Sequence, residues 1–219
     1  MEHKKFEKYT AMALETVYSE QEDGNFHTNL IPEVVKHFFT PLNIPKHAYV
    51  LDIGCGQGTF LDIMLALDYP NSVGITYSKD DHEACEGKNL SVINCDMSDM
   101  LVPDDIVDFI WCRHALEHSP YPLFTLFEFN RVMRQGGKMY IEVPAPDCAR
   151  RHEDNPNHFS ILGEVMWQSL FRKAGFETLS ASHFDFELRH EENIIPERYL
   201  CFIVEKNATP IQVRTKAAD

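Results

Sequence analysis

The sequence predicts an α/β protein built on a doubly wound, mostly parallel β-sheet. A short apolar run at residues 49–53 ends in the glycine-rich stretch 54–58, and apolar residues then repeat at helical spacing over residues 60–67. A strand, a glycine turn and a helix in this order are typical of sheets that bind a nucleotide-like ligand at a strand's carboxyl end, against a helix N-terminus. Further short apolar runs predict strands at 72–76, 90–94, 106–112 and 138–143.

Length and composition are those of one ordinary globular domain. The chain has 219 residues, of which 44% are hydrophobic and 25% charged. No run approaches the roughly 20 apolar residues of a membrane span, which argues against a membrane partner. The opening MEHKKFEKYT lacks the apolar segment of a signal peptide, so we expect a cytoplasmic protein. The net charge of −14 argues against a nucleic-acid partner, because phosphates require a basic face.

The cysteines predict neither a disulfide framework nor a zinc site. None of the six forms a C-x-x-C pair, and several fall in predicted strands or in the glycine loop. We expect reduced, mostly buried thiols in a reducing compartment. The six are Cys55, Cys85, Cys95, Cys112, Cys148 and Cys201.

The flanking segments predict a helical segment before a central domain and a tail after it. Residues 1–45 form an N-terminal helical segment, with helices at 2–22 and about 29–40, that either packs against the sheet or forms a lid. Residues 46–206 form the ligand-binding domain, and 207–219 a loose tail. Within the domain we expect helices at 122–133, capped by 135–137, and at 161–174, with final strands at 176–188 and 198–205. The polar loop 144–160 is too long for a simple turn and predicts a functional role.

The glycine spacing distinguishes between ligands. A dinucleotide-binding fingerprint has the form G-x-G-x-x-G, whereas this loop reads G-x-G-x-G and has Thr59 at the place of the third glycine. Asp52 stands just before the loop, where its carboxylate would repel a pyrophosphate and suits an ammonium group. A nicotinamide cofactor is therefore disfavoured.

The stretch LDIGCGQG resembles the first motif of the class I S-adenosylmethionine-dependent methyltransferases, in their small-molecule type. The run DFIWCRHALEHS, with RVMRQGGKMYIEVP after it, resembles the corresponding part of the same enzymes. The resemblance covers about residues 49–144 and, more loosely, 158–176. It implies a Rossmann-like, seven-stranded sheet with an antiparallel final strand, and S-adenosylmethionine as cofactor. It places beside that cofactor Asp52, Gly54, Cys55, Gly56 and Gln57.

The end of the second strand departs from the family pattern. The family usually has an acid there that holds both ribose hydroxyls. In this chain the position falls on Thr76. Either Tyr77 and Ser78 supply the hydrogen bonds, or the acid is displaced to Asp80 or Asp81.

The third and fourth strands carry the next predicted cofactor contacts. In the family an acid just past the third strand receives the adenine amino group, and an apolar neighbour stacks on the ring. Asp96 and Met97 fit these roles, although an aspartate here also suits a turn or helix cap. Arg113, at the end of the fourth strand, either lies beside the cofactor or holds an acidic substrate group.

His114 is the first candidate for a catalytic base. It follows the fourth strand by two residues, at the edge where ligands of parallel sheets gather. A hydroxyl acceptor needs a base, and imidazole titrates near neutral pH. The alternative is a hydrogen-bonded histidine of structural importance, or one that lies beside the cofactor without proton transfer.

The spacing H-x-x-E-H over His114, Glu117 and His118 raises the question of a metal. Positions i, i+3 and i+4 of a helical turn share a face, and imidazoles with a carboxylate hold divalent ions. Some methyltransferases with E-x-x-E-H here, acting on quinone precursors or small-RNA ends, are metal-assisted. A metal at Glu117 and His118 is one reading; a structural or substrate-facing, catalytic His118 is the one we favour. Four residues are candidates to complete a metal shell: His152, Asp154, His158 and His183.

Together these patterns predict methyl transfer to a small-molecule acceptor. Oxygen is the first choice of acceptor atom and nitrogen the second, with a sugar, a nucleotide-sugar or a natural-product intermediate as the acceptor. The alternatives are a nicotinamide-dependent oxidoreductase of similar fold and a non-catalytic cofactor-binding protein that interacts with a partner.

Overall fold

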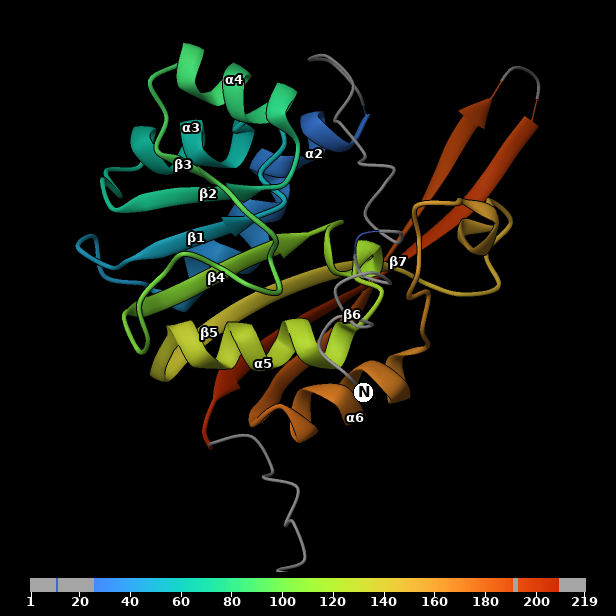
Figure 1. The fold of residues 1–219 in the computed structure, drawn as a ribbon. Coiled ribbons are helices and arrows are strands. Elements are labelled where there is room, and N and C mark those ends of the chain that lie inside the picture. The colour runs from blue at the N-terminus through green and yellow to red at the C-terminus, as the bar shows by residue number, and fades with distance from the viewer. Residues whose placement is uncertain (1–10, 12–25, 191–192, 209–219) are drawn as a thin grey trace, which may run out of the picture.

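The predicted sheet is present. The structure, a computed structural model, describes residues 11, 26–190 and 193–208. In this part of the chain one seven-stranded sheet has the order β3-β2-β1-β4-β5-β7-β6 (Figure 1). Strands β1 to β5 pair in parallel, and β7 runs antiparallel to both of its neighbours. The strands are β1 Val50–Ile53, β2 Ser72–Thr76, β3 Val92–Asn94, β4 Val107–Arg113, β5 Met133–Pro144, β6 Phe176–His190 and β7 Asn193–Lys206.

Helices cover both faces of the sheet, as a doubly wound fold requires (Figure 1). One side carries α2 Phe26–Val34, α3 Thr59–Ala66 and α4 Lys79–Gly87; the other carries α5 Pro122–Val132 and α6 Glu164–Lys173. A π-helical turn, Val35–Phe39, continues α2. No helix of the described residues is both long and apolar enough to cross a bilayer.

The central strand β4 shows why the sheet is buried on both faces. Phe109 and Trp111 belong to the core under α2 and α3, whereas Ile110 and Cys112 belong to the core under α5 and α6. Trp111 stacks on Phe60 of α3 with ring centroids 4.5 Å apart. Because alternate side chains enter opposite cores, the strand reads as one continuous apolar run.

The register of the central strands fixes where the site lies. Ile53, the last residue of β1, pairs with Ile75 on one side and Cys112 on the other. The chain therefore leaves β1, β2 and β4 at one edge of the sheet, and the segments that follow them meet there.

The segments after β2 and α5 differ from the sequence prediction. Helix α4 was not predicted, because Ala84 and Cys85 are its only apolar residues and no apolar stripe marks it. Strand β5 begins at Met133, where the prediction had a helix end and a glycine cap. A register shift pairs Met133 with Val107 and Lys138 with Phe109, so the glycines lie within an irregular strand.

The C-terminal and N-terminal parts also show differences in extent. Helix α6 begins at Glu164 and not at 161, and β7 begins at Asn193 and not at 198, so the β6–β7 hairpin extends beyond the sheet (Figure 1). The helix expected near 29–40 begins at Phe26. The helix expected at 2–22 and the tail beyond 208 lie outside the described residues, residue 11 apart. All six cysteines are described, and none forms a disulfide.

Candidate functional site

The loop between β1 and α3 brings bare backbone to the carboxyl edge of the sheet. Gly54, Gly56 and Gly58 have positive φ angles of 69°, 49° and 86°. A Cβ atom on Gly54 would lie 2.7 Å from Ala115 Cβ, closer than van der Waals contact allows. The loop therefore needs glycine for conformation and, at Gly54, for space, and a ligand can approach its main chain closely.

A cavity of about 520 Å³ lies against this loop. Its size suits a small-molecule ligand. Gln57 does not line it, although it was predicted to bind the cofactor; its carbonyl oxygen instead accepts a hydrogen bond from Lys88 Nζ at 2.9 Å. The other predicted cofactor residues all line the cavity: Asp52, Gly54, Cys55, Gly56, Thr76, Tyr77, Ser78, Asp96, Met97 and Arg113.

The segment after β2 places the carboxylate of Asp81 in the cavity wall, although Thr76 stands at the family's usual acid position. Thr76 is buried, and its hydroxyl accepts a hydrogen bond from the Ser78 amide at 3.1 Å. Ser78 caps α4, because its hydroxyl accepts from the Asp81 amide at 3.2 Å. Asp81 is buried and lines the cavity, whereas Asp80 is exposed. Of the two displaced acids considered from the sequence, only Asp81 lines the cavity.

Asp96 makes a turn contact and also lies in the cavity wall. Its Oδ1 accepts a hydrogen bond from the Ser98 amide at 2.8 Å, as in a turn-forming aspartate. It also lines the cavity, together with the neighbouring Met97. The turn holds the carboxylate at the cavity wall, so the structural role and the binding role are compatible.

An ionic network lies beside the cavity, which its members Arg113, His114 and Glu117 line. Arg113 Nε lies 2.9 Å from Glu142 Oε1, and both side chains are buried. His114 Nε2 lies 2.8 Å from the same carboxylate oxygen, and His114 Nδ1 lies 3.4 Å from Glu117 Oε1. His114 also has a positive φ of 52°, uncommon for a residue other than glycine, and its amide donates to the Glu142 carbonyl at 2.9 Å.

The network favours the charged forms of its carboxylates and of His114. Burial favours the neutral form of Glu142, but Arg113, His114 and Tyr140 outweigh it and lower the Glu142 pKa to about 2. Burial likewise lowers the pKa of His114, but the carboxylates of Glu117 and Glu142 more than offset this and raise it above its ordinary value. Both ring nitrogens of His114 face carboxylates. The geometry therefore does not support the prediction that His114 is the base.

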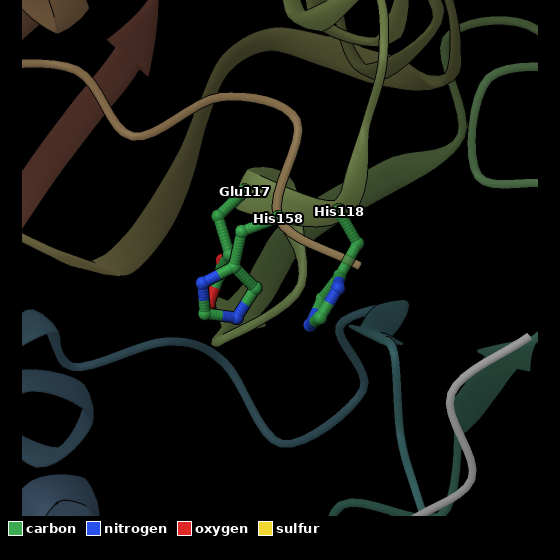
Figure 2. A group of neighbouring side chains, drawn as sticks. All are labelled: Glu117, His118 and His158. Atoms are coloured by element: carbon green, nitrogen blue, oxygen red, sulfur yellow. The ribbon is translucent and has the colours of Figure 1, made fainter. Parts of the chain in front are cut away.

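A second pair of histidines faces the cavity from neighbouring segments. His118 ends the 3-10 turn Leu116–His118, and its Nδ1 donates to the Asn157 carbonyl at 2.8 Å. His158 lies in the loop before α6, with its ring centroid 4.9 Å from that of His118. Ligand atoms of Glu117, His118 and His158 lie within 4.8 Å of one another, and the three side chains are shown in Figure 2.

Of the four residues considered for completing a metal shell, only His158 joins Glu117 and His118. His152 lines the cavity but its Nε2 lies 3.0 Å from the buried carboxylate of Glu197. Asp154 pairs with Arg151 through an Nε–Oδ2 contact of 2.7 Å. His183 pairs with Glu164 at 2.9 Å and does not line the cavity.

No site role was predicted from the sequence for Tyr199 and His27, which line the cavity, or for Glu142, which contacts Arg113 and His114. Tyr199 of β7 is fully buried, and its hydroxyl has no hydrogen-bond partner among the described residues. Burial, followed by the charge of Glu197, raises the pKa of Tyr199. Burial and the positive charges of His114 and Arg113 lower the pKa of His27 to about 3. Of these residues only Glu142 could have been noticed in the sequence. It is a carboxylate within an otherwise apolar predicted strand, and a buried carboxylate needs a partner.

Comparison with known proteins identifies the family. A family model described as "Methyltransferase domain" matches residues 26–181. The 27-O-demethylrifamycin SV methyltransferase of Amycolatopsis mediterranei is 26% identical over 60% of this chain, and the chain spans 55% of that relative. An uncharacterized protein of Methanocaldococcus jannaschii, MJ1123, is 29% identical over 78% of the chain and 84% of its own length.

The fold agrees with solved structures. The crystal structure of a SAM-dependent methyltransferase from Archaeoglobus fulgidus superimposes with a TM-score of 0.65 at 20% identity, over 82% of this chain and 94% of that one. At this identity the likeness concerns the fold alone. The family model covers most of the chain, and the glycine loop, sheet order and carboxyl-edge cavity agree with it. The chain therefore belongs to the class I S-adenosylmethionine-dependent methyltransferases.

Proposed function

We propose that this chain transfers the methyl group of S-adenosylmethionine to an oxygen atom of a small molecule. The observation that carries the proposal is the cavity itself, which joins a glycine loop at one end to Glu117, His118 and His158 at the other. The glycine end suits a nucleoside-like cofactor and the acceptor end, beside the three side chains, suits a polar acceptor, and both border the same cavity.

The residues at the glycine end fit the cofactor. When bound, S-adenosylmethionine supplies an electrophilic methyl group on a sulfonium sulfur. Gly54, Cys55 and Gly56 line the cavity, so the main chain of the glycine loop can border the ligand. Asp52 offers a carboxylate to an ammonium group, Asp81 offers one to ribose hydroxyls, and Asp96 offers one to an adenine amino group.

The chain's own task is to hold the acceptor and exclude water. Alignment of the reacting atoms can lower the activation free energy of methyl transfer by up to roughly 7–11 kcal/mol. A hydroxyl acceptor must also lose a proton. Because both ring nitrogens of His114 face carboxylates, we assign this activation to the set Glu117, His118 and His158.

The relatives support an oxygen acceptor. The rifamycin relative is named for an O-demethylated substrate, and a Paenibacillus relative, 23% identical over 59% of this chain, is named malonyl-[acyl-carrier protein] O-methyltransferase. This chain spans 55% of each of them, so their activities are a guide to the acceptor atom only. We propose a sugar, a nucleotide-sugar or a natural-product intermediate as the acceptor.

Direct titration tests the proposal. Calorimetry of the purified chain with S-adenosylmethionine and with S-adenosylhomocysteine is expected to show one site per chain. Incubation with methyl-labelled cofactor and pooled small hydroxylated metabolites is expected to yield an alkali-stable, labelled ether or a labile ester. Tight binding of NAD with no response to either sulfur compound would refute the proposal.

A further inference from the structure

Three side chains at the acceptor end form a set that no step of cofactor binding requires. Glu117 and His118 come from the 3-10 turn after β4, and His158 comes from the loop before α6. Figure 2 shows the three side chains projecting in the same direction from these two segments. Each offers a ligand atom, and these atoms lie within 4.8 Å of one another.

The hydrogen bonds of the two histidines fix their tautomers. His118 Nδ1 lies 2.8 Å from the Asn157 carbonyl, and His158 Nδ1 lies 3.0 Å from the His152 carbonyl. A carbonyl oxygen only accepts, so each Nδ1 carries a proton and, in the neutral ring, each Nε2 carries a lone pair. An imidazole anchored through one N–H to a backbone carbonyl is the usual state of a metal-binding histidine.

The nitrogen Nε2 of His158 has one protein neighbour that a ligand must replace. The Asn155 amide nitrogen lies 3.2 Å from it, which agrees with a lone pair at this position. The Asn155 side-chain oxygen accepts from the Asn157 amide at 3.0 Å, so the amide group has a defined orientation. An ion at Nε2 would take the place of a single neutral hydrogen bond.

Glu117 supplies a negative charge that the protein satisfies on one side only. Its side chain is 1% exposed. Its Oε1 faces His114 at 3.4 Å, whereas Oε2 has no hydrogen-bond partner in the described part of the chain. A buried carboxylate oxygen without a partner is costly, and a cation between Glu117 and the two imidazoles would satisfy it.

The backbone holds the two segments in register. The amides of Phe159 and Ser160 both donate to the Glu117 carbonyl, at 2.9 and 3.0 Å, and the Ser160 hydroxyl donates to the Ser119 carbonyl at 2.9 Å. These contacts flank His158 directly. The three ligand atoms are therefore brought together by main-chain bonds, before any ion binds.

We propose that Glu117, His118 and His158 bind one divalent transition-metal ion whose remaining positions face the cavity. Two imidazoles and one carboxylate suit Zn²⁺, Co²⁺, Ni²⁺ or Fe²⁺, whereas Mg²⁺ and Ca²⁺ prefer sites made of oxygen atoms. When bound, such an ion would hold the acceptor oxygen and lower the pKa of its hydroxyl, whose proton would pass to water; His118 would then be a ligand and not a base. This role depends on the proposed methyl transfer, but metal binding does not.

The test is direct binding of Co²⁺ to chelator-treated full-length protein. We expect visible absorption bands that saturate at one Co²⁺ per chain, displacement by Zn²⁺, and no competition by millimolar Mg²⁺. His118→Gln and His158→Gln are each expected to weaken binding at least about tenfold, or about 1.4 kcal/mol. His183→Gln is the matched control, because His183 also pairs with a glutamate but lies outside the cavity; its affinity should equal that of the wild type.

Three results would overturn the proposal: no Co²⁺ binding by the wild type, binding that survives both cavity variants, or equal weakening by His183→Gln. Circular dichroism and thermal melting of each variant identify loss of fold, and two independent variants guard against it. A titration with S-adenosylhomocysteine on the same samples separates the two proposals. Metal binding without cofactor binding refutes the proposed function alone, and the reverse result refutes the metal site alone.

Discussion

Replacing Gly54 by alanine tests the glycine loop most directly. A Cβ atom at this position would lie 2.7 Å from Ala115 Cβ, about 0.7 Å inside the 3.4 Å at which ordinary contact begins. The φ of 69° adds about 1–2 kcal/mol for any residue with a side chain. We expect Gly54→Ala to lower the free energy of unfolding by about 1–3 kcal/mol. Displacement of the loop by several tenths of an ångström should weaken binding of S-adenosylhomocysteine at least about tenfold.

Two further variants separate the causes. Ala115→Gly removes the atom that the new methyl group would strike, so the double variant Gly54→Ala/Ala115→Gly should regain affinity while keeping the conformational cost at Gly54. Gly87→Ala is the control, since a Cβ there meets nothing within 4 Å. Urea unfolding and calorimetry measure both quantities. An affinity for Gly54→Ala equal to that of the wild type would show that the loop does not border the ligand.

Three other substitutions have expected outcomes. Asp81→Asn should weaken S-adenosylhomocysteine about tenfold by calorimetry while Asp80→Asn changes it less than about twofold, because only Asp81 lines the cavity; equal effects would contradict the assignment. Lys206→Met should cost about 2–4 kcal/mol in urea unfolding, since the buried Nζ donates to three oxygens within 2.8 Å; a cost below about 0.5 kcal/mol would be inconsistent with that contact. Tyr199→Phe should leave the unfolding free energy within about 0.5 kcal/mol or raise it, because the hydroxyl has no partner among the described residues; a large loss would reveal a missed bond.

The glycine end of the site was predictable because its information is local. The loop residues follow one another within a few positions, and their spacing alone disfavoured a dinucleotide. Asp96 and Met97 line the cavity, and the sequence indicated their place because they come shortly after the end of β3. Gln57 belongs to the same stretch but does not line the cavity, because spacing gives the path of the main chain and not the surroundings of each side chain.

The acceptor end depends on contacts between distant segments, and the sequence gives little sign of them. The sequence favoured His114 as a base because Glu142 is distant from it along the chain. In the structure Glu142 of β5 lies 2.8 Å from the His114 ring, which the sequence does not reveal. Helix α4 escaped prediction because its cap at Ser78, and not an apolar stripe, marks its start. His158 was one of several candidate histidines, and only the loop's hydrogen bonds to the Glu117 backbone select it.

The two ends of the cavity come from different stretches of the chain. Most of the cofactor end lies within residues 52–97, whereas the acceptor end combines the turn after β4 with residues 150–159 and Tyr199 of β7. Under the proposed function, substitutions in the later stretches change which molecule is modified and leave binding of the methyl donor intact. The loop 150–159 and the β6–β7 hairpin are then the segments to exchange when a new acceptor is wanted.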